Sequence, residues 1–303
     1  MAKLTFLISL ITEESDYQRE QAASAQLAAA RLNVDLRISY ADNDAIRQSQ
    51  QLFQVIHGPS DGVKAIIVEP AGSTAFPQVA RAAVDAGLGW VLMNRDDASV
   101  GELARRAGPP VFSVTADQRE TGRILGRQIG TLLREGGQVL CLLGPSSNPV
   151  STERMAGMSE TQPSNVKLKL LRCPYWTENA GFQAISSWLR VSVSQQVDFA
   201  AVIGQSDLIA LGARRAFQEL AAPAARQDWL ALPFLGVNGL KVGQDAVQTG
   251  MLASTVIVPP STVPAIELLV RVYTEGFRPP NSTLVKPKSY PDLEMLTPRA
   301  PKT

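Results

Sequence analysis

Short aliphatic runs alternate with longer amphipathic segments along almost the whole chain. The segment Tyr17 to Arg31 is rich in alanine and glutamine and predicts a helix. Phe76 to Ala86 predicts another, for which Gly72-Ser73-Thr74 would supply the capping residues. Alternation of this kind is typical of βα units that build a parallel sheet covered on both faces. The aliphatic runs predict strands at about 3–10, 34–39, 64–69, 89–93, 111–114, 138–143, 167–172, 199–203, 232–237 and 252–257.

The predicted strands fall into two sets, and the change lies near Val114-Thr115-Ala116-Asp117. A chain of 303 residues is long enough for two hydrophobic cores. We therefore predict an α/β fold with two doubly wound parallel-sheet lobes. The first comprises residues 1–114 plus 259–284, the second residues 115–258 plus 285–303, and a hinge with three crossings joins them. Prolines recur after Ile257, so we expect these segments to be connections between lobes rather than lobe interiors.

Charge and hydropathy argue against direct nucleic-acid binding and against a membrane-spanning helix in this chain. The chain has 29 Lys and Arg against 28 Asp and Glu, without the clustered positive charge that binds nucleic acid. No run approaches the roughly 20 apolar residues of a membrane helix. The apolar run at the start is too short for a secretion signal and lacks a small-residue cleavage site. Two expectations stay open: a cytoplasmic protein, or a periplasmic or extracellular protein whose signal peptide has been removed.

The motifs of common enzymes and metal sites are missing. His57 is the single histidine, and its place before Gly58-Pro59 indicates a solvated helix end rather than a catalytic triad. The run Gly144-Pro145-Ser146-Ser147-Asn148 follows a strand but lacks the later glycines of a phosphate loop. Cys141 and Cys173 end or interrupt apolar runs, which favours buried free thiols over a disulfide, and their spacing fits no zinc site. We expect no catalytic residue, metal or cofactor.

Polar residues gather directly after the predicted strands, where a doubly wound lobe binds its ligand. Amides, carboxylates, guanidinium groups and aromatic rings together suit a polyhydroxylated ligand, because its hydroxyls both donate and accept. Each residue alone could equally reflect loop polarity or helix capping; Asp207, for example, could be an N-cap. The candidate ligand-binding residues are Thr12, Glu13, Tyr17, Glu69, Asn94, Arg95, Arg154, Trp176, Ser206, Asp207 and Asn238.

Four segments in order resemble a known family: Ile66-Ile67-Val68-Glu69-Pro70, Val91-Leu92-Met93-Asn94-Arg95, Gln205-Ser206-Asp207 with Leu211-Gly212-Ala213, and Gly236-Val237-Asn238-Gly239. They are similar to the strand ends of type I periplasmic binding proteins, both ribose-type sugar-binding proteins and the effector domains of LacI-type repressors. The resemblance covers Leu4 to about Leu296. It implies that an acid and arginine pair that binds sugar hydroxyls maps to Asn94 and Arg95.

In the second lobe the resemblance implies that Arg154 reaches the ligand and that Trp176 stacks on its ring. The ends of later strands would contribute Ser206, Asp207 and Asn238.

The sequence also departs from the family pattern. Amides stand at Asn94 and Asn238, where carboxylates are usual, and an amide donates as well as accepts. Glu69 stands where asparagine is common, and Val258 where a polar side chain often closes the pocket. We expect a neutral sugar or polyol, with a sugar acid as the alternative because Arg95 and Arg154 are both kept.

These observations predict a monomeric solute-binding receptor that closes on a sugar, polyol or sugar acid for an ABC-type transporter or a sensor. One alternative is the effector domain of a LacI-type regulator, although such repressors carry an N-terminal DNA-reading segment of roughly 50–60 residues and this chain starts directly at the first strand. An enzyme with Glu69 and Asp96 as an acid and base pair is the other.

Overall fold

The computed structural model describes residues 3–58, 62–72, 76–95, 97–106, 108–146, 149–191 and 198–298. The chain divides into two compact units. Unit 1 comprises Met1–Ala116 and Pro260–Val285, and unit 2 comprises Asp117–Pro259 and Lys286–Thr303. The chain therefore passes from one unit to the other after residues 116, 259 and 285, where the sequence analysis expected 114, 258 and 284.

Unit 1 is built on a six-stranded sheet in which every neighbouring pair is parallel. The strand order is β11-β5-β4-β3-β1-β2. The strands are β1 (Thr5–Leu10), β2 (Asp35–Tyr40), β3 (Val63–Val68), β4 (Gly89–Met93), β5 (Val111–Ala116) and β11 (Ser282–Val285). The helices are α1 (Asp16–Leu32), α2 (Ala45–His57), α3 (Pro77–Asp85), α4 (Ala98–Ala104) and α11 (Thr262–Glu275).

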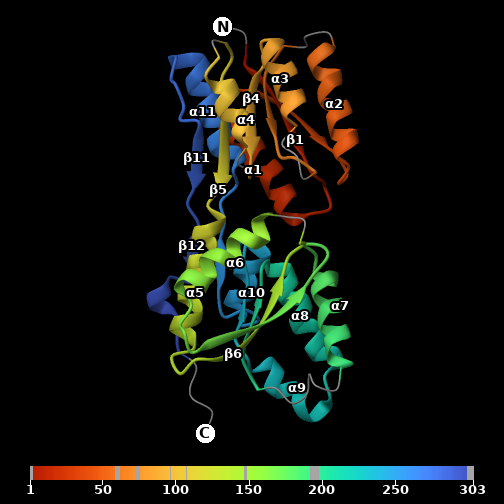
Figure 1. Ribbon diagram of the computed structural model, residues 1–303, viewed down its shortest axis with the longest axis vertical. Helices are drawn as coiled ribbons and strands as arrows, with labels where there is room; N and C mark the ends of the chain where they lie inside the picture. Colours follow the sequence, from red (N-terminus) through yellow and green to blue (C-terminus); the bar gives the residue numbers. More distant parts are fainter. Residues whose placement is uncertain are drawn as a thin grey trace. The chain divides into compact units, whose positions relative to one another are not determined.

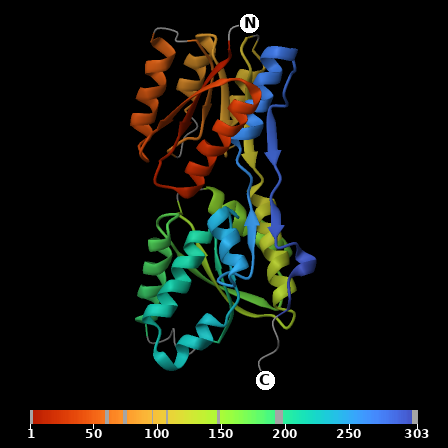
Figure 2. The ribbon, with the colours of Figure 1, turned by 180° about the vertical axis from the view of Figure 1, so that it is seen from behind.

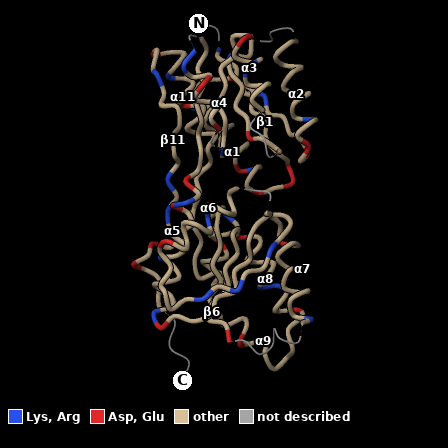
Figure 3. The backbone as a smooth tube through the Cα atoms, in the orientation of Figure 1, with Lys and Arg blue, Asp and Glu red and all other residues tan. Residues whose placement is uncertain are grey.

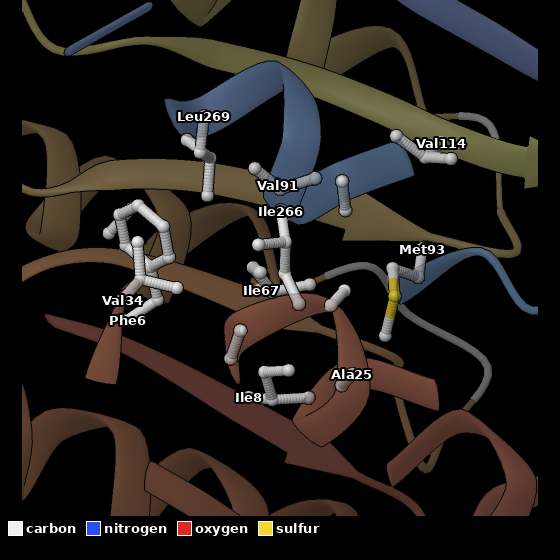
Figure 4. Close-up of a cluster of buried hydrophobic side chains, with 14 of the residues drawn as sticks. Phe6, Ile8, Ala25, Val34, Ile67, Val91, Met93, Val114, Ile266 and Leu269 are labelled. Carbon is white, nitrogen blue, oxygen red and sulfur yellow. The ribbon is translucent and has the colours of Figure 1, made fainter. Parts of the chain in front are cut away.

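Helices cover both faces of this sheet, so unit 1 has two cores (Figure 1). Helices α1 and α11 lie side by side on one face (Figure 2). Figure 4 shows Phe6, Ile8 and Ile67 of the sheet in one buried cluster with Ala25 of α1 and Ile266 of α11. The intervening strand residues pack on the other face against α2, α3 and α4. Burial on both faces explains why the strands read as continuous aliphatic runs rather than as alternating patterns.

Unit 2 contains a four-stranded parallel sheet with the order β7-β6-β8-β9. Its strands are β6 (Gly137–Leu143), β7 (Val166–Arg172), β8 (Phe199–Gly204) and β9 (Phe234–Leu235), and β10 (Thr255–Ile257) pairs antiparallel with β12 (Lys288–Tyr290). The helices are α5 (Gln118–Leu132), α6 (Pro149–Thr161), α7 (Glu178–Leu189), α8 (Asp207–Leu220), α9 (Pro223–Leu230), α10 (Lys241–Gln248) and the short η2 (Leu293–Met295).

Helices α5 and α6 approach unusually closely because glycines face the partner helix. A Cβ atom at Gly122 would lie 2.0 Å from the backbone oxygen of Arg154, and one at Gly157 would lie 1.8 Å from that of Arg119. Only glycine fits where two backbones come this near. The contact fixes the helix that carries Arg154.

The predicted α/β class with parallel sheets in two lobes is confirmed, but the expectation for the C-terminal segment is wrong. Residues 282–285 form β11, which pairs with β5 inside unit 1, and residues 288–290 form β12. Pro279, Pro280 and Pro287 flank these strands without interrupting them, and β11 lies at a sheet edge, where flanking prolines cost no ladder hydrogen bond. The strand predicted at 252–257 is observed as β10, which pairs antiparallel with β12, and this segment also makes parallel bridges beside β9, between Leu235 and Ser254 and between Asn238 and Ile257.

The predicted cap of the helix after residue 76 is also wrong. Helix α3 has Phe76 as its N-cap, with a left-handed backbone and no side-chain cap bond, and Pro77 occupies its first turn. Proline suits this position because the first helical N–H has no partner within the helix. Ser73 and Thr74 lie outside the described residues.

Charged residues of both signs are distributed over both units (Figure 3). Among the described residues, no helix is long and apolar enough to cross a membrane.

Candidate functional site

Three neighbouring strands of unit 1 end in predicted site residues. Strands β4, β3 and β1 are adjacent and parallel, so their carboxyl ends meet at one edge of the sheet. Glu69 follows β3, Asn94 and Arg95 follow β4, and Thr12 and Glu13 follow β1. This edge therefore gathers five of the predicted residues from segments far apart in sequence.

Glu69 is a buried carboxylic acid with 8% of its surface exposed. Burial raises the pKa of its carboxyl, against smaller opposing effects of the Gln18 and Asn94 amides and of the Arg95 charge. Its Oε2 atom is buried and has no hydrogen-bond partner in the described part of the chain. A buried acceptor of this kind costs free energy until a donor reaches it.

Asn94 has a left-handed backbone, with φ of 53°, which asparagine tolerates better than most residues. Its Oδ1 atom accepts from the hydroxyl of Ser261 at 2.7 Å and more weakly from the backbone N–H of Ala116. Its Nδ2 atom is buried and has no hydrogen-bond partner among the described residues. The fold thus uses the oxygen of this amide and leaves a donor available, which the carboxylate usual in the family could not provide.

Arg95 is half-buried, and desolvation lowers the pKa of its guanidinium, whereas the charges of Glu69 and Asp97 raise it. Its buried Nη1 atom has no hydrogen-bond partner in the described ranges. Asp97 is committed to capping α4, because its carboxylate accepts from the backbone N–H of Ser99 at 2.8 Å. Asp96, the possible catalytic partner of Glu69, lies outside the described residues.

The residues predicted from the loop after β1 have different roles. The hydroxyl of the buried Thr12 accepts from the backbone N–H of Glu14 at 3.2 Å, which stabilises the loop. Glu13 is exposed, and its carbonyl accepts from the guanidinium of Arg19. Tyr17 lies in the first turn of α1 and is partly buried. Its prediction as a ligand contact stays a prediction.

Two glutamines that the sequence analysis missed hold this edge in shape. Gln18 accepts from the backbone N–H of Ile11 at 2.9 Å, and its amide also acts on the Glu69 carboxyl. Gln48 is fully buried; its Nε2 atom donates to Ser9 and to the carbonyl of Glu69, and its Oε1 atom accepts from Ala71. Both lie in helices, whereas the sequence analysis selected polar residues that directly follow predicted strands, so it could not identify them.

In unit 2, Arg154 is 5% exposed and is held by three elements. Its Nε atom donates to Gln118 at 2.8 Å, one Nη atom donates to the carbonyl of Gln205, and the other donates to Asn238 at 3.4 Å. Its guanidinium carbon lies 5.6 Å from the ring centre of Trp176. The structure therefore brings together three residues that the sequence analysis predicted for the second lobe.

Trp176 is partly buried and its ring lies against the backbone of Gly144. A Cβ atom at Gly144 would meet the ring at 2.0 Å, so the absence of a side chain there makes room for the indole. This explains the glycine in the loop after β6 without any phosphate. The rest of that loop, Ser147 and Asn148, lies outside the described residues.

Gln205 links the parts of this cluster and was not among the predicted ligand residues. It is 1% exposed, and its Oε1 atom accepts from the backbone N–H of Gly144 at 3.0 Å and from the hydroxyl of Ser151 at 2.6 Å. Its Nε2 atom donates to the carbonyl of Ser151 at 3.1 Å. One side chain thus positions the loop beneath Trp176 and the first turn of the helix that carries Arg154.

Ser206 and Asp207 are buried and have partners inside unit 2. Ser206 is the N-cap of α8 and accepts from Ile209, so the cap is this serine and not Asp207. Asp207 accepts from Gly239 at 2.8 Å and from Thr255 at 2.6 Å. These contacts fix the turn that holds Asn238 with its positive φ of 104°. Val258, the departure noted from the family pattern, is also buried.

The expectations for His57 and for the two cysteines are confirmed. His57 ends α2, is exposed, and stacks on Phe53. Cys141 and Cys173 are buried free thiols, and burial raises the pKa of each to about 12. Within the described ranges, no group of His, Cys, Asp and Glu could hold a metal ion.

Two proteins with similar sequences are both import binding proteins. The D-apiose import binding protein of Paraburkholderia graminis is 26% identical over 262 residues, which cover 85% of this chain and 77% of that protein. The ribose import binding protein of Escherichia coli (strain K12) is 26% identical over 267 residues, 88% of this chain and 82% of that protein.

Among solved structures, a periplasmic solute-binding protein of an ABC transporter from Actinobacillus succinogenes, with bound D-allose, shares the fold. The TM-score is 0.79 at 20% identity, over 96% of this chain and 98% of that one. The sequence profile of the family described as periplasmic binding protein domain matches residues 6–272. The chain therefore belongs to the periplasmic binding protein domain family.

Proposed function

We propose that this protein is the solute-binding receptor of an import system and that its ligand is a sugar or polyol. The observation that carries the proposal is the set of three buried polar atoms without partners among the described residues: Glu69 Oε2, Asn94 Nδ2 and Arg95 Nη1. They comprise one acceptor and two donors on adjacent strand ends. A ligand with neighbouring hydroxyls can satisfy all three, because each hydroxyl both donates and accepts.

The ring of Trp176 beside Arg154 supports the same class of ligand. Sugar rings have apolar faces that pack on an indole, while their hydroxyls need donors and acceptors at the rim. Each of the two clusters is proposed to contribute ligand contacts: Glu69, Asn94 and Arg95 in unit 1, and Arg154 and Trp176 in unit 2. Thr12, Glu13, Tyr17 and Asn238 stay proposed contacts, whereas for Ser206 and Asp207 we favour a positioning role.

The names of the relatives favour a receptor over the other expectations. The ribose and D-apiose relatives are import binding proteins, which fits a periplasmic receptor and offers no support for a regulator or an enzyme. We propose that the partner is a membrane transporter of the ABC type and that the receptor is a monomer. Light scattering after gel filtration tests the second point.

The test of the proposed function is a thermal-shift screen with sugars, polyols and sugar acids. A ligand at a hundred times its dissociation constant should add about 2.7 kcal/mol to the free energy of unfolding. A sugar or polyol that raises the melting temperature and binds in calorimetry supports the proposal, and the absence of any stabilising compound in the panel contradicts it. The expected closing movement stays a prediction, which small-angle scattering with the bound ligand would test.

A further inference from the structure

The carboxyl edge of unit 1 carries a surplus of acids. The segments after β1, β3 and β4 contain more carboxylates than guanidinium groups among their described residues: Glu13, Glu14, Asp16, Glu69 and Asp97 against Arg19 and Arg95. The exposed acids are screened by solvent and salt, and Asp97 is used as a helix cap. Asp16 is partly buried, and its carboxylate accepts from the backbone N–H of Tyr17 at 2.9 Å. Glu69 differs from these acids because it is almost fully buried.

The carboxyl of Glu69 has no ion-pair partner within 4.0 Å among the described residues. Arg95 acts on it through its charge, but no salt bridge joins the two side chains. The nearby amides of Gln18 and Asn94 lower the pKa of this carboxyl, but Glu69 Oε2 and Asn94 Nδ2 each have no partner at hydrogen-bond distance in the described part of the chain. A buried carboxylate without a counter-ion is costly, and a cation that reaches it recovers part of that cost.

We propose, on the basis of the receptor function proposed above, that the ligand is a hydroxylated amine, with its ammonium group on Glu69 and a neighbouring hydroxyl on Asn94 and Arg95. The ammonium donates to Oε2, and the oxygen of the hydroxyl accepts from Nδ2 of Asn94 and Nη1 of Arg95. The ligand thus contains both an amino group and a hydroxyl on one sugar or polyol. Glu69 is the residue that determines this specificity.

A sugar acid fits this edge less well. Its carboxylate could accept from Asn94 and Arg95, but it would lie beside the Glu69 carboxyl without donating to it. Two carboxylates close together in a buried site repel each other strongly, because little water is present to screen their charges. The amide of Asn94 therefore donates to a ligand hydroxyl. The family pattern has a carboxylate at this position, whereas in this chain the buried carboxylate is that of Glu69, after the neighbouring strand.

The experiment compares matched ligands by calorimetric titration at low and moderate salt. The probes are D-glucose with D-glucosamine, and myo-inositol with an inositol in which an amino group replaces one hydroxyl. At least one amine should bind about tenfold or more tightly than its hydroxyl counterpart, and its affinity should fall as salt increases. The variant Glu69→Gln should lower the affinity for that amine by at least about tenfold and change that for the hydroxyl counterpart much less.

The control is Glu14→Gln, which removes one exposed negative charge from the same edge and should change the affinity for the amine by less than about twofold. Circular dichroism and a thermal melt establish that each variant is folded. Neutral probes that bind equally well or more tightly than the amines overturn the inference and leave the receptor function intact. Equal loss of both ligand classes in Glu69→Gln overturns it as well. If no sugar, polyol or amine binds, the proposed function itself fails.

Discussion

The two units place polar residues at the carboxyl ends of parallel strands, but they differ in how these residues are satisfied. In unit 2, the side chains of Arg154, Gln205 and Asp207 all have hydrogen-bond partners in their own unit. In unit 1, buried atoms of Glu69 and Asn94 have none among the described residues. The unit 2 cluster beside Trp176 is therefore satisfied within its own unit, whereas the unit 1 cluster has unmet hydrogen-bonding capacity.

This difference has an energetic meaning. Unmet buried donors and acceptors lower the stability of a protein, and a ligand that satisfies them recovers that loss on binding. A satisfied network instead stabilises the fold and positions the residues it contains. Substitutions in the unit 2 cluster should therefore reduce stability, whereas removing the unmet charge in unit 1 should increase stability and reduce binding.

The largest effect should come from Gln205→Leu. This change leaves the backbone N–H of Gly144 and both polar groups of Ser151 without their partner, so the free energy of unfolding should fall by about 2–4 kcal/mol. Denaturant unfolding followed by tryptophan fluorescence measures it, since Trp176 lies in the affected cluster. The exposed Gln248→Leu in the same unit should stay within about 0.5 kcal/mol of the parent. A similar small change for Gln205→Leu would refute the role of this glutamine as a link.

The next effect concerns the aromatic ring. Trp176→Ala should weaken binding of the tightest panel ligand by about 1–3 kcal/mol, because stacking and apolar contact are lost. Gly144→Ala should weaken it through the same ring, since the added methyl occupies the place of the indole. Calorimetric titration measures both. Trp229→Phe, in the aromatic cluster with Trp188 and Phe217, should leave affinity unchanged. Unchanged affinity in Trp176→Ala would return this residue to a packing role.

Glu69→Gln should raise the free energy of unfolding, whereas Gln205→Leu lowers it. Because burial raises the pKa of Glu69, the folded chain holds this proton to higher pH than the unfolded chain, and stability falls as pH rises through the raised pKa. The variant lacks this decrease and should be more stable at neutral pH without ligand, by about 1–3 kcal/mol. Unfolding measured across pH, with Glu14→Gln as the control, checks it. A variant less stable than the parent at neutral pH would show that Glu69 is satisfied in the native protein.

Much of the fold could be predicted from the sequence because the strands are buried on both faces. Runs such as Ile66-Ile67-Val68 and Val139-Leu140-Cys141 have no polar interruption, and each matches an observed strand. Strand β11 carries no such signal, since it is a short edge strand with alternating exposure between prolines. Its pairing with β5 depends on residues more than 160 positions away, for example Ser282 with Ser113.

For the candidate site, the sequence predicted where the residues lie in the fold but not which atoms they bind. Polar residues after strands could be placed at the sheet edge, but their partners could not. Asp207 accepts from Gly239 and Thr255, which are 32 and 48 residues further along the chain. Gln205 stood in a recognised segment, yet nothing in its neighbours indicated that its side chain turns toward Gly144 and Ser151. Such roles depend on long-range packing, which a local pattern does not record.

The smallest effect separates capping from ligand binding at Ser206. Its hydroxyl accepts from the backbone N–H of Ile209 at 3.1 Å, which is the bond of an N-cap. Ser206→Ala should therefore lower the free energy of unfolding by about 1 kcal/mol, whereas Ser206→Gly should lower it by only a few tenths, since glycine is a tolerated N-cap. If capping is the whole role, both variants keep the parent's affinity in calorimetric titration. A loss of affinity of about tenfold in both variants, independent of their different stabilities, would instead place the hydroxyl on the ligand. Unit 2 would then contribute a polar contact as well as the aromatic ring, and the contrast between a satisfied and an unsatisfied cluster would be weaker than the hydrogen bonds indicate.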